Sequence, residues 1–226
     1  MPWEQNPINL RTNTTLTHVK AMPDSSPDYQ FPDARILMFT KAPLAGKVKT
    51  RLISVLGEQG ALNLHLQLME RQLKVLHKSP LCPVQLWLDQ EHEHPLFDSF
   101  SGDVKLQSGG NLGDKMLHAA RTVLKQAGTV IIIGSDCPDL DEEYLHEALM
   151  VLQDKHTDLV LGPAEDGGYV LIGMKQAHPE VFQDIDWGTA VVLQQTLARI
   201  EGAGLAQQCL SPLRDVDTRE DLASLL

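Results

Sequence analysis

Short apolar runs alternate with longer amphipathic segments along this chain from residue 34 onward. Apolar runs of about four to eight residues bounded by turn residues are typical of buried strands, whereas apolar residues spaced three and four apart are typical of one buried helical face. On these criteria we predict strands at 35–40, 84–89, 104–107, 130–134, 158–162 and 169–174. The same criteria predict helices at 58–78, 112–127, 142–153, 189–201 and 218–226.

The character of these segments indicates how they are arranged. The run from Val130 to Ile133 is apolar at every position, which is typical of a strand covered on both faces. In the helix predicted at 58–78, Leu62 and Leu66 begin a series of apolar residues along one face. The alternation of such strands and helices predicts an α/β fold with a mostly parallel central sheet flanked by helices.

Length and composition favour one domain. With 226 residues, of which 42% are hydrophobic, the chain can bury one substantial core. Residues 1–33 are polar, rich in Pro, Ser, Thr and Asn, and without periodicity, so we predict a poorly ordered N-terminal extension. Residues 34–226 then form the single predicted domain.

Charge excludes some classes of partner. The chain carries 19 Lys and Arg against 30 Asp and Glu, a net charge of −11, which argues against nucleic acid and anionic membranes as partners. No apolar run is long enough to span a bilayer, and no signal peptide is visible. The three cysteines are too few for a disulfide framework, so we expect a cytoplasmic protein.

Against this acidic background, a basic loop follows the first predicted strand. The segment 41–51 holds Lys41, Lys47, Lys49 and Arg51 together with Gly46. A loop that leaves the carboxyl end of a strand exposes backbone N–H groups, and cations there suit phosphate oxygens. The alternative is a solvated basic loop without a ligand. The Walker-type P-loop spacing is absent.

Carboxylates follow a second apolar strand. Asp136 and Asp139 lie in the turn after residues 130–134. Mg²⁺ commonly takes one or two carboxylates while substrate phosphates and water complete its shell. Asp136 is therefore a candidate metal ligand, and Asp139 or Asp141 is better explained as the N-cap of the following helix.

Further turns at strand ends carry candidate substrate contacts. Asp166 precedes Gly167 and Gly168, so this turn can approach a ligand closely, although Asp-Gly is also an ordinary turn signal. Two further glycines, Gly110 and Gly113, form a weak candidate for the floor of a nucleobase site.

The remaining candidates lie near the C-terminus. Trp187 could wall a sugar or simply pack, and Thr189 is a candidate helix cap. Thr218 and Asp221 have capping-box spacing. Asp215 and Asp217 are not explained by capping, so a ligand role stays open for both.

Five segments in order resemble one known family: 39–52, 134–140, 163–169, 187–189 and 215–218. They are similar to the radical-SAM/selenodomain-associated transferases, a domain-of-unknown-function family (DUF2064) also labelled arsenosugar-biosynthesis glycosyltransferases. The resemblance covers residues 34–226. It implies the nucleotide-diphospho-sugar transferase (GT-A) fold and a relationship to bacterial guanylyltransferases.

The resemblance also implies roles for individual residues. Lys41, Lys49 and Arg51 would hold nucleotide phosphates, and Asp136 would stand at the position of a metal-binding aspartate. Combined with the loop and turn chemistry above, the full set of predicted site residues is as follows. The nucleotide-binding residues are Lys41, Gly46, Lys47, Lys49, Thr50, Arg51, Gly110 and Gly113; the substrate-binding residues are Gly167, Gly168, Trp187 and Thr189; the catalytic residues are Asp166 and Lys49; and Asp136 and Asp217 bind the metal, Mg²⁺ or Mn²⁺.

The chain departs from the family pattern at two places. The basic loop reads Leu44-Ala45-Gly46 where Val/Ile-Pro-Gly is expected, which keeps the glycine. The Asp-x-Asp signature of many metal-dependent glycosyltransferases is replaced by the four residues 136–139, so their metal geometry does not transfer directly.

Three functions fit these features. The first is a glycosyltransferase that moves a sugar from a nucleotide-diphospho-sugar to a small acceptor with help from a divalent cation. The second is a guanylyltransferase-like nucleotidyltransferase, which transfers NMP from an NTP to a phosphorylated small molecule and releases pyrophosphate. The third is a nucleotide binder without activity. The sequence leaves the base, the sugar, the acceptor and homodimer formation open.

Overall fold

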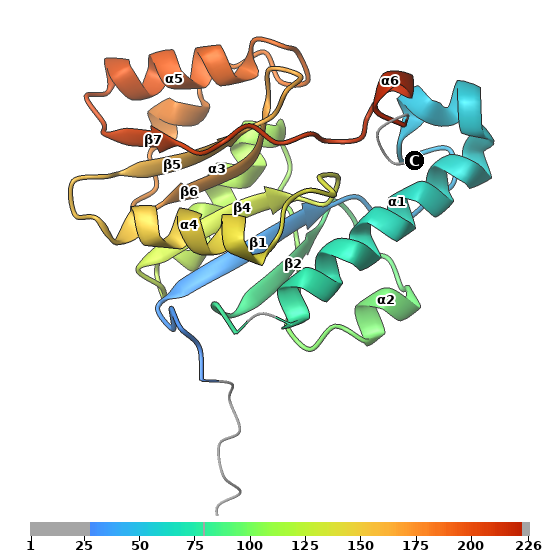
Figure 1. Ribbon diagram of the computed structural model, residues 1–226, viewed down its shortest axis with the longest axis horizontal. Helices are drawn as coiled ribbons and strands as arrows, with labels where there is room; N and C mark the ends of the chain where they lie inside the picture. The colour runs from blue at the N-terminus through green and yellow to red at the C-terminus, as the bar shows by residue number, and fades with distance from the viewer. Residues whose placement is uncertain (1–27, 79, 223–226) are drawn as a thin grey trace, which may run out of the picture.

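The computed structural model describes residues 28–78 and 80–222. A seven-stranded sheet forms its centre, with the strands in the order β3-β2-β1-β4-β6-β5-β7 (Figure 1). The strands are β1 (Ala34–Thr40), β2 (Val84–Leu88), β3 (Asp103–Leu106), β4 (Thr129–Gly134), β5 (Leu159–Pro163), β6 (Tyr169–Met174) and β7 (Gln207–Cys209). The helices are α1 (Ile53–Lys78), α2 (Pro95–Asp98), α3 (Leu112–Val123), α4 (Glu142–Gln153), α5 (Val192–Gly202) and α6 (Arg219–Leu222).

The sheet is mixed. Strands β1, β2, β3 and β4 pair in parallel, and β5 pairs in parallel with β7. Strand β6 runs antiparallel to both of its neighbours, β4 and β5. The α/β class and the flanking helices are confirmed, and the reversed strand β6 makes the sheet mixed. Its reversal brings the start of β6 to the same edge as the carboxyl ends of β4 and β5.

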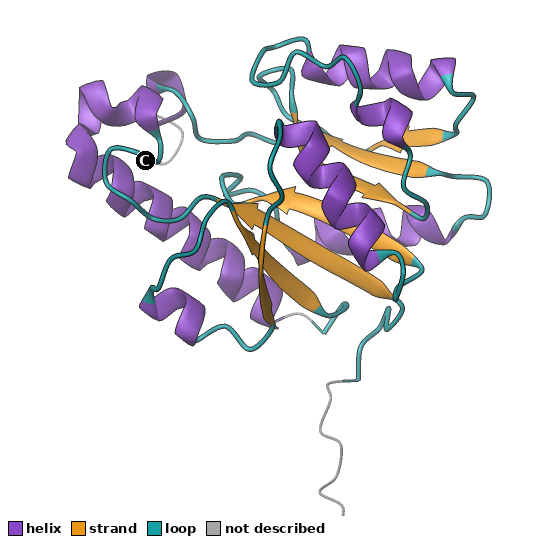
Figure 2. Ribbon diagram, turned by 180° about the vertical axis from the view of Figure 1, so that it is seen from behind, coloured by secondary structure: helices purple, strands orange, loops and turns teal. Residues whose placement is uncertain are grey.

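Two apolar layers separate the sheet from its helices. Ile36 and Met38 of β1 pack towards α1 and α4, whereas Leu37 and Phe39 pack towards α3 and α5. Figure 1 shows α1 and α4 in front of the sheet, and Figure 2 shows the opposite face. Because side chains of a strand alternate between faces, a strand that is apolar throughout serves both layers, as predicted.

Most predicted helices begin and end close to their observed bounds. Helix α1 begins earlier than predicted, at Ile53, but Gly57 (φ 70°, ψ 170°) breaks it just before the predicted start. Asn111 and Asp114 form a capping box on α3, and the Asp141 side chain caps α4. Thr189 does not cap α5, because Val191 occupies the N-cap position and that helix has no side-chain cap.

Parts of two predicted segments, the N-terminal extension and the last helix, lie outside the described residues. Residues 1–27 of the predicted extension and residues 223–226 of the last predicted helix belong to that part. Within the described part of the extension, Gln30 and Phe31 donate backbone hydrogen bonds to Pro80 and Leu81. Phe31 is buried in the apolar layer beneath α1 and α4. In the described ranges, no helix has the length and apolar composition that a membrane span requires.

Candidate functional site

The basic loop between β1 and α1 is held in a compact shape by its own backbone. The Lys47 N–H donates to the Leu44 carbonyl at 3.0 Å, and Gly46 takes a positive φ of 76° between them. The Ala42 N–H donates to the Asp89 carboxylate at 2.7 Å, which ties the loop to the end of β2. The loop therefore lies at the carboxyl edge of the sheet, where open α/β sheets bind ligands.

Lys49 turns inward from this loop. Its backbone takes the left-handed conformation (φ 46°, ψ 42°), which is uncommon for a residue with a side chain. Its ammonium lies 2.9 Å from Oδ2 of Asp136 and donates to the Val216 carbonyl at 2.5 Å. The Lys49 side chain is 2% exposed and that of Asp136 is 43% exposed. Lys49 thus carries a buried charge that Asp136 neutralises from the edge of the cavity.

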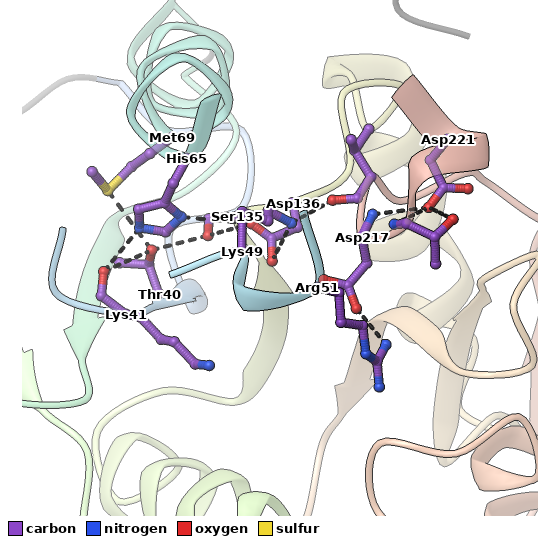
Figure 3. A network of polar contacts seen from close by, with 12 residues as sticks. Thr40, Lys41, Lys49, Arg51, His65, Met69, Ser135, Asp136, Asp217 and Asp221 are labelled. Atoms are coloured by element: carbon purple, nitrogen blue, oxygen red, sulfur yellow. Dashed lines mark hydrogen bonds and ion pairs between the residues drawn. The ribbon is translucent and has the colours of Figure 1, made fainter. Parts of the chain in front are cut away.

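Polar side chains beside Asp136 form a connected series (Figure 3). The Ser135 hydroxyl donates to Asp136 Oδ1 at 3.3 Å and lies 2.9 Å from the Thr40 hydroxyl. His65 of α1 bonds the Lys41 carbonyl through Nε2 at 3.0 Å, and its Nδ1 is 3.9 Å from Asp136 Oδ1. Burial lowers the pKa of His65 below its ordinary value, and the charge of Asp136 opposes this effect. The imidazole is therefore neutral near pH 7, with its proton on Nε2.

The C-terminal segment, residues 210–222, closes the other side of the site. It leaves β7 and crosses to α6 beside the beginning of α1 (Figure 1). The Val216 N–H donates to the Asp136 carbonyl at 3.1 Å. The Asp217 carboxylate lies 2.5 Å from a guanidinium nitrogen of Arg51. The Asp221 side chain accepts from the N–H and hydroxyl of Thr218, so the predicted capping-box spacing does form local hydrogen bonds.

Two adjacent cavities open along this sheet edge and have five lining residues in common; we call the two together the groove. We call the larger, of about 540 Å³, the basic lobe. We call the smaller, of about 300 Å³, the acidic lobe. The residues common to both walls are Phe39, Arg51, Leu112, Gly134 and Asp217. Arg51 and Asp217 therefore stand at the junction of the two lobes.

The acidic lobe is built around the turn between β5 and β6. The Asp166 carboxylate accepts the Gly168 N–H at 2.8 Å. Gly167 takes φ 93°, and a Cβ atom there would lie 2.1 Å from the Ala190 carbonyl oxygen. This contact requires glycine, and it holds the turn against the 187–190 segment. The ring of Trp187 meets Tyr169 edge-on, with centroids 6.3 Å apart, and forms part of the same wall.

Asp215 lies in this wall as a half-buried carboxyl. Burial, and after it the charge of Asp166, raises its pKa from the ordinary value of 3.8 to about 6. Two carboxyl groups in one small cavity disfavour each other's ionised form. Because pH 7 still lies above the raised pKa, Asp215 is mostly ionised there and adds negative charge to the lobe.

The structure gathers most of the predicted site residues on this groove. The basic lobe is lined by Lys41, Lys49, Thr50, Arg51, Asp136 and Asp217. The acidic lobe is lined by Asp166, Gly168, Trp187 and Thr189, with Arg51 and Asp217 again. Five predicted residues do not line either lobe: Gly46, Lys47, Gly110, Gly113 and Gly167. Gly167 stands behind the wall, where it permits the close packing described above.

The glycines predicted as a nucleobase floor have other surroundings. A Cβ atom on Gly113 would lie 2.7 Å from the Trp187 ring and 2.9 Å from the Phe182 carbonyl oxygen. Gly110 takes φ 98° beside Asp114, next to the capping box of α3. Both glycines thus have a packing role at the start of α3, and their nucleotide role remains a prediction.

Several lining residues were not predicted from the sequence. Asp89, Gln107, Lys115 and Ser135 line the basic lobe together with His65. One signal did exist for His65, which falls on the buried face of α1 four residues before Met69. A polar residue on an apolar helical face needs a partner, and here the partners come from the loop. The other four gave no comparable signal.

The fold has its groove at the carboxyl edge of the sheet, where other open α/β proteins bind ligands. The chain belongs to the family described as "Uncharacterized protein conserved in bacteria (DUF2064)", whose model matches residues 72–189, about half of the sequence. The predicted family is therefore confirmed. Its association with radical-SAM enzymes stays an expectation.

Solved structures share this fold. A protein from Desulfovibrio desulfuricans G20, provisionally described as a nucleotide-diphospho-sugar transferase, is 34% identical, with 86% of this chain and 87% of that chain covered and a TM-score of 0.78. CMP:2-keto-3-deoxy-manno-octonic acid synthetase in complex with CTP is 11% identical, with coverage of 85% and 96% and a TM-score of 0.54. A mannosyltransferase from Pyrobaculum calidifontis in complex with GDP-Man and Mn²⁺ is 13% identical, with coverage of 84% and 58% and a TM-score of 0.50. The comparison with curated proteins gave no match.

Proposed function

We propose that this protein is a glycosyltransferase that moves a sugar from a nucleotide-diphospho-sugar to a small acceptor. The observation that carries the proposal is the two-lobed groove, in which a basic lobe joins an acidic one at Arg51 and Asp217. A nucleotide-sugar has two matching parts: its diphosphate dianion suits the basic lobe, and its uncharged sugar suits the acidic lobe. The membership of the DUF2064 family and the shared fold of nucleotide-dependent transferases support a nucleotide as the donor.

In this proposal the basic lobe holds the diphosphate. Lys41 and Lys115 line it, and Arg51 offers a guanidinium fork at the junction, a shape that suits phosphate oxygens. Lys49 is already bonded to Asp136 and to the Val216 carbonyl. It therefore lines the lobe as a fixed ammonium group whose charge Asp136 balances. Cations held in place before reaction stabilise charge that develops on a leaving group without reorganisation.

The transfer breaks the bond between the anomeric carbon and the β-phosphate oxygen, and the electron pair leaves with the nucleoside diphosphate. An acceptor hydroxyl forms the new bond to the anomeric carbon and gives up its proton. Asp166 lines the acidic lobe, where its carboxylate can take that proton. One oxygen of Asp166 already accepts the Gly168 N–H, which fixes the direction of the other oxygen.

A divalent cation shared with the diphosphate would take Asp136 and Asp217 from their present partners, Lys49 and Arg51. No group of three His, Cys, Asp or Glu side chains within 28–78 and 80–222 could hold a metal alone. Asp136 and Asp217 both line the basic lobe, and two carboxylates are what Mg²⁺ usually takes when phosphates complete its shell. Bound there, the cation would neutralise charge on the leaving diphosphate.

Nucleotidyl transfer is the second candidate function. The specific observation in its favour is the shared fold of the CTP-bound synthetase, which the chain matches over 85% of its length. A basic lobe that holds phosphates would serve this chemistry as well. The two functions differ in the donor and in the product that leaves.

Calorimetric titration with NTPs and nucleotide-sugars, each with and without Mg²⁺ or Mn²⁺, tests the proposal. We expect metal-dependent binding of a nucleotide-sugar and release of free nucleoside diphosphate when acceptor is added. Arg51→Leu should weaken this binding by about tenfold, because it removes a charge-assisted contact. Lys125→Met is the matched control, since Lys125 is exposed and lines neither lobe. Preferred binding of an NTP with release of pyrophosphate would move the function to nucleotidyl transfer. Binding of neither class would refute both.

A further inference from the structure

The charges that line the two lobes differ in sign. The basic lobe carries Lys41, Lys49, Lys115 and Arg51 against Asp89, Asp136 and Asp217. The acidic lobe carries Asp166, Asp215 and Asp217, and Arg51 is the only cation among the described residues that line it. The groove therefore goes from a net positive lining to a net negative one across the junction.

The one cation of the acidic lobe is already engaged. Arg51 bonds the Asp217 carboxylate at 2.5 Å and the Gly188 carbonyl at 3.4 Å. A phosphate monoester in this lobe would meet Asp166 and Asp215 and would have to compete with Asp217 for the arginine. Like charges placed together in a partly buried site exclude a partner more strongly than weak contacts attract it.

The rest of the wall suits an uncharged polyol. Carboxylates accept hydrogen bonds from hydroxyl groups, and Trp187 offers an aromatic surface for the apolar face of a sugar ring. Trp187 is held in place from two sides, because Gly113 leaves no room for a Cβ atom against its ring and Tyr169 meets it edge-on. A fixed aromatic ring beside acceptor oxygens is a selective arrangement, since little ordering is needed when the ligand binds.

We propose that the acidic lobe selects an unphosphorylated polyhydroxylated group and excludes its phosphate ester. The inference rests on the proposed function and names its substrate class: the group beside the donor diphosphate, whether the sugar of the donor or the acceptor, carries no phosphate. An acceptor that must be phosphorylated, as in nucleotidyl transfer to a sugar phosphate, does not match this lobe.

Matched pairs of small molecules test the selectivity. Ligand-observed NMR at pH 8 would measure the affinity of glucose against glucose 6-phosphate, mannose against mannose 6-phosphate, and glycerol against glycerol 3-phosphate. Each pair is measured on the full chain with UDP and Mn²⁺ or GDP and Mn²⁺ present, so that the nucleotide occupies the basic lobe and the phosphate ester cannot bind there. We expect the neutral member to bind at least about tenfold more tightly than its ester in one or more pairs. A phosphorylated member that binds equally well or better in every pair overturns the inference, as does the absence of any neutral binding.

Charge-neutralising variants assign the selectivity to this lobe. Asp215→Asn and Asp166→Asn should each reduce the preference for the neutral member by about threefold or more, whereas Glu201→Gln, on the exposed surface of α5, should not change it. An unchanged preference in both lobe variants overturns the inference.

Neutral binding that persists with a nucleotide-sugar present identifies the group as the acceptor, and displacement by the nucleotide-sugar identifies it as the donor sugar; both support the inference. Nucleotide binding is a separate readout: its loss refutes the proposed function, whereas retained nucleotide binding with a preference for esters refutes only this inference.

Discussion

Replacing Asp215 by asparagine should stabilise the protein at neutral pH, although it removes a carboxylate from the candidate site. The pKa of Asp215 rises from 3.8 to about 6 in the folded protein, first because of burial and then because of Asp166. Folding therefore favours the protonated form. The stability that this group contributes is fully present below pH 3.8 and is lost as the pH rises through 6. At pH 7.5 the ionised carboxylate lowers the free energy of unfolding, and asparagine has no charge to do so.

The size of the effect follows from the shift. About two pKa units correspond to about 3 kcal/mol, at about 1.4 kcal/mol per unit. Asp215 is only half-buried, so solvent screening reduces this figure, and we expect about 1 kcal/mol. Sites that bind ligands commonly hold such unfavourable groups, and removing them raises stability at the expense of function.

Urea unfolding at pH 4 and pH 7.5, in buffer with a chelator, would measure the difference. The free energy of unfolding of Asp215→Asn should exceed that of the native sequence by about 1 kcal/mol more at pH 7.5 than at pH 4. Asp166→Asn should narrow this difference, because it removes the neighbouring charge that raises the Asp215 pKa. Glu201→Gln controls for the loss of an exposed carboxylate. Equal differences at the two pH values, or a less stable variant at pH 7.5, would refute the reasoning.

Three further perturbations test the structure around the site. A double-mutant cycle of Lys49→Met and Asp136→Asn, followed by urea unfolding, should give a coupling of about 2 kcal/mol, since either single change leaves a charge without its partner; a coupling near zero would mean that the pair is not formed. Gly167→Ala should lower the free energy of unfolding by about 2 kcal/mol or more, because its Cβ would strike the Ala190 carbonyl at a positive φ, and unchanged stability would contradict that contact. Burial lowers the pKa of His65, so its contribution to stability is present above pH 6.5 and lost as the pH falls below that value. The Asp215 carboxyl gains stability as the pH falls, so this test uses the Asp215→Asn background, in which that opposite trend is removed. In this background His65→Gln should flatten the decline in unfolding free energy below pH 6.5. An equally steep decline would show that His65 is not its source.

The central strands and most helices could be predicted because their patterns are local. A run such as Val130 to Ile133 is apolar at every position, so it reports burial on two faces without any knowledge of its neighbours. Strand β7 gave no such signal, because its three residues are polar and exposed and pair with β5 at the edge of the described sheet. The four-residue helix α2, which begins at Pro95, is too short for a periodic pattern. The antiparallel direction of β6 depends on how the strand pairs with β4 and β5, and its apolar sequence does not show that direction.

The candidate site was predictable to the extent that its residues follow strands. Each predicted turn lies at the same sheet edge, and most of the predicted side chains line one groove. The burial of Lys49 was not predictable, since a lysine in a basic loop is normally solvated and its partners are Asp136 and Val216, far away in sequence. The packing of Gly113 against Trp187 is likewise a long-range contact.

These long-range contacts make the two halves of the site depend on each other. Lys49 and Arg51 stand two residues apart in the basic loop. Their partners, Val216 and Asp217, are neighbours in the C-terminal segment. The loop therefore holds the C-terminal segment against the groove, and Asp217 of that segment balances the charge of Arg51. Under the proposed function, a diphosphate that binds Arg51 would compete with Asp217, so the free energy of donor binding would include the cost of changing this contact. By thermodynamic reciprocity, donor binding at Arg51 would weaken the attachment of the C-terminal segment by the same free energy that this attachment takes from donor binding.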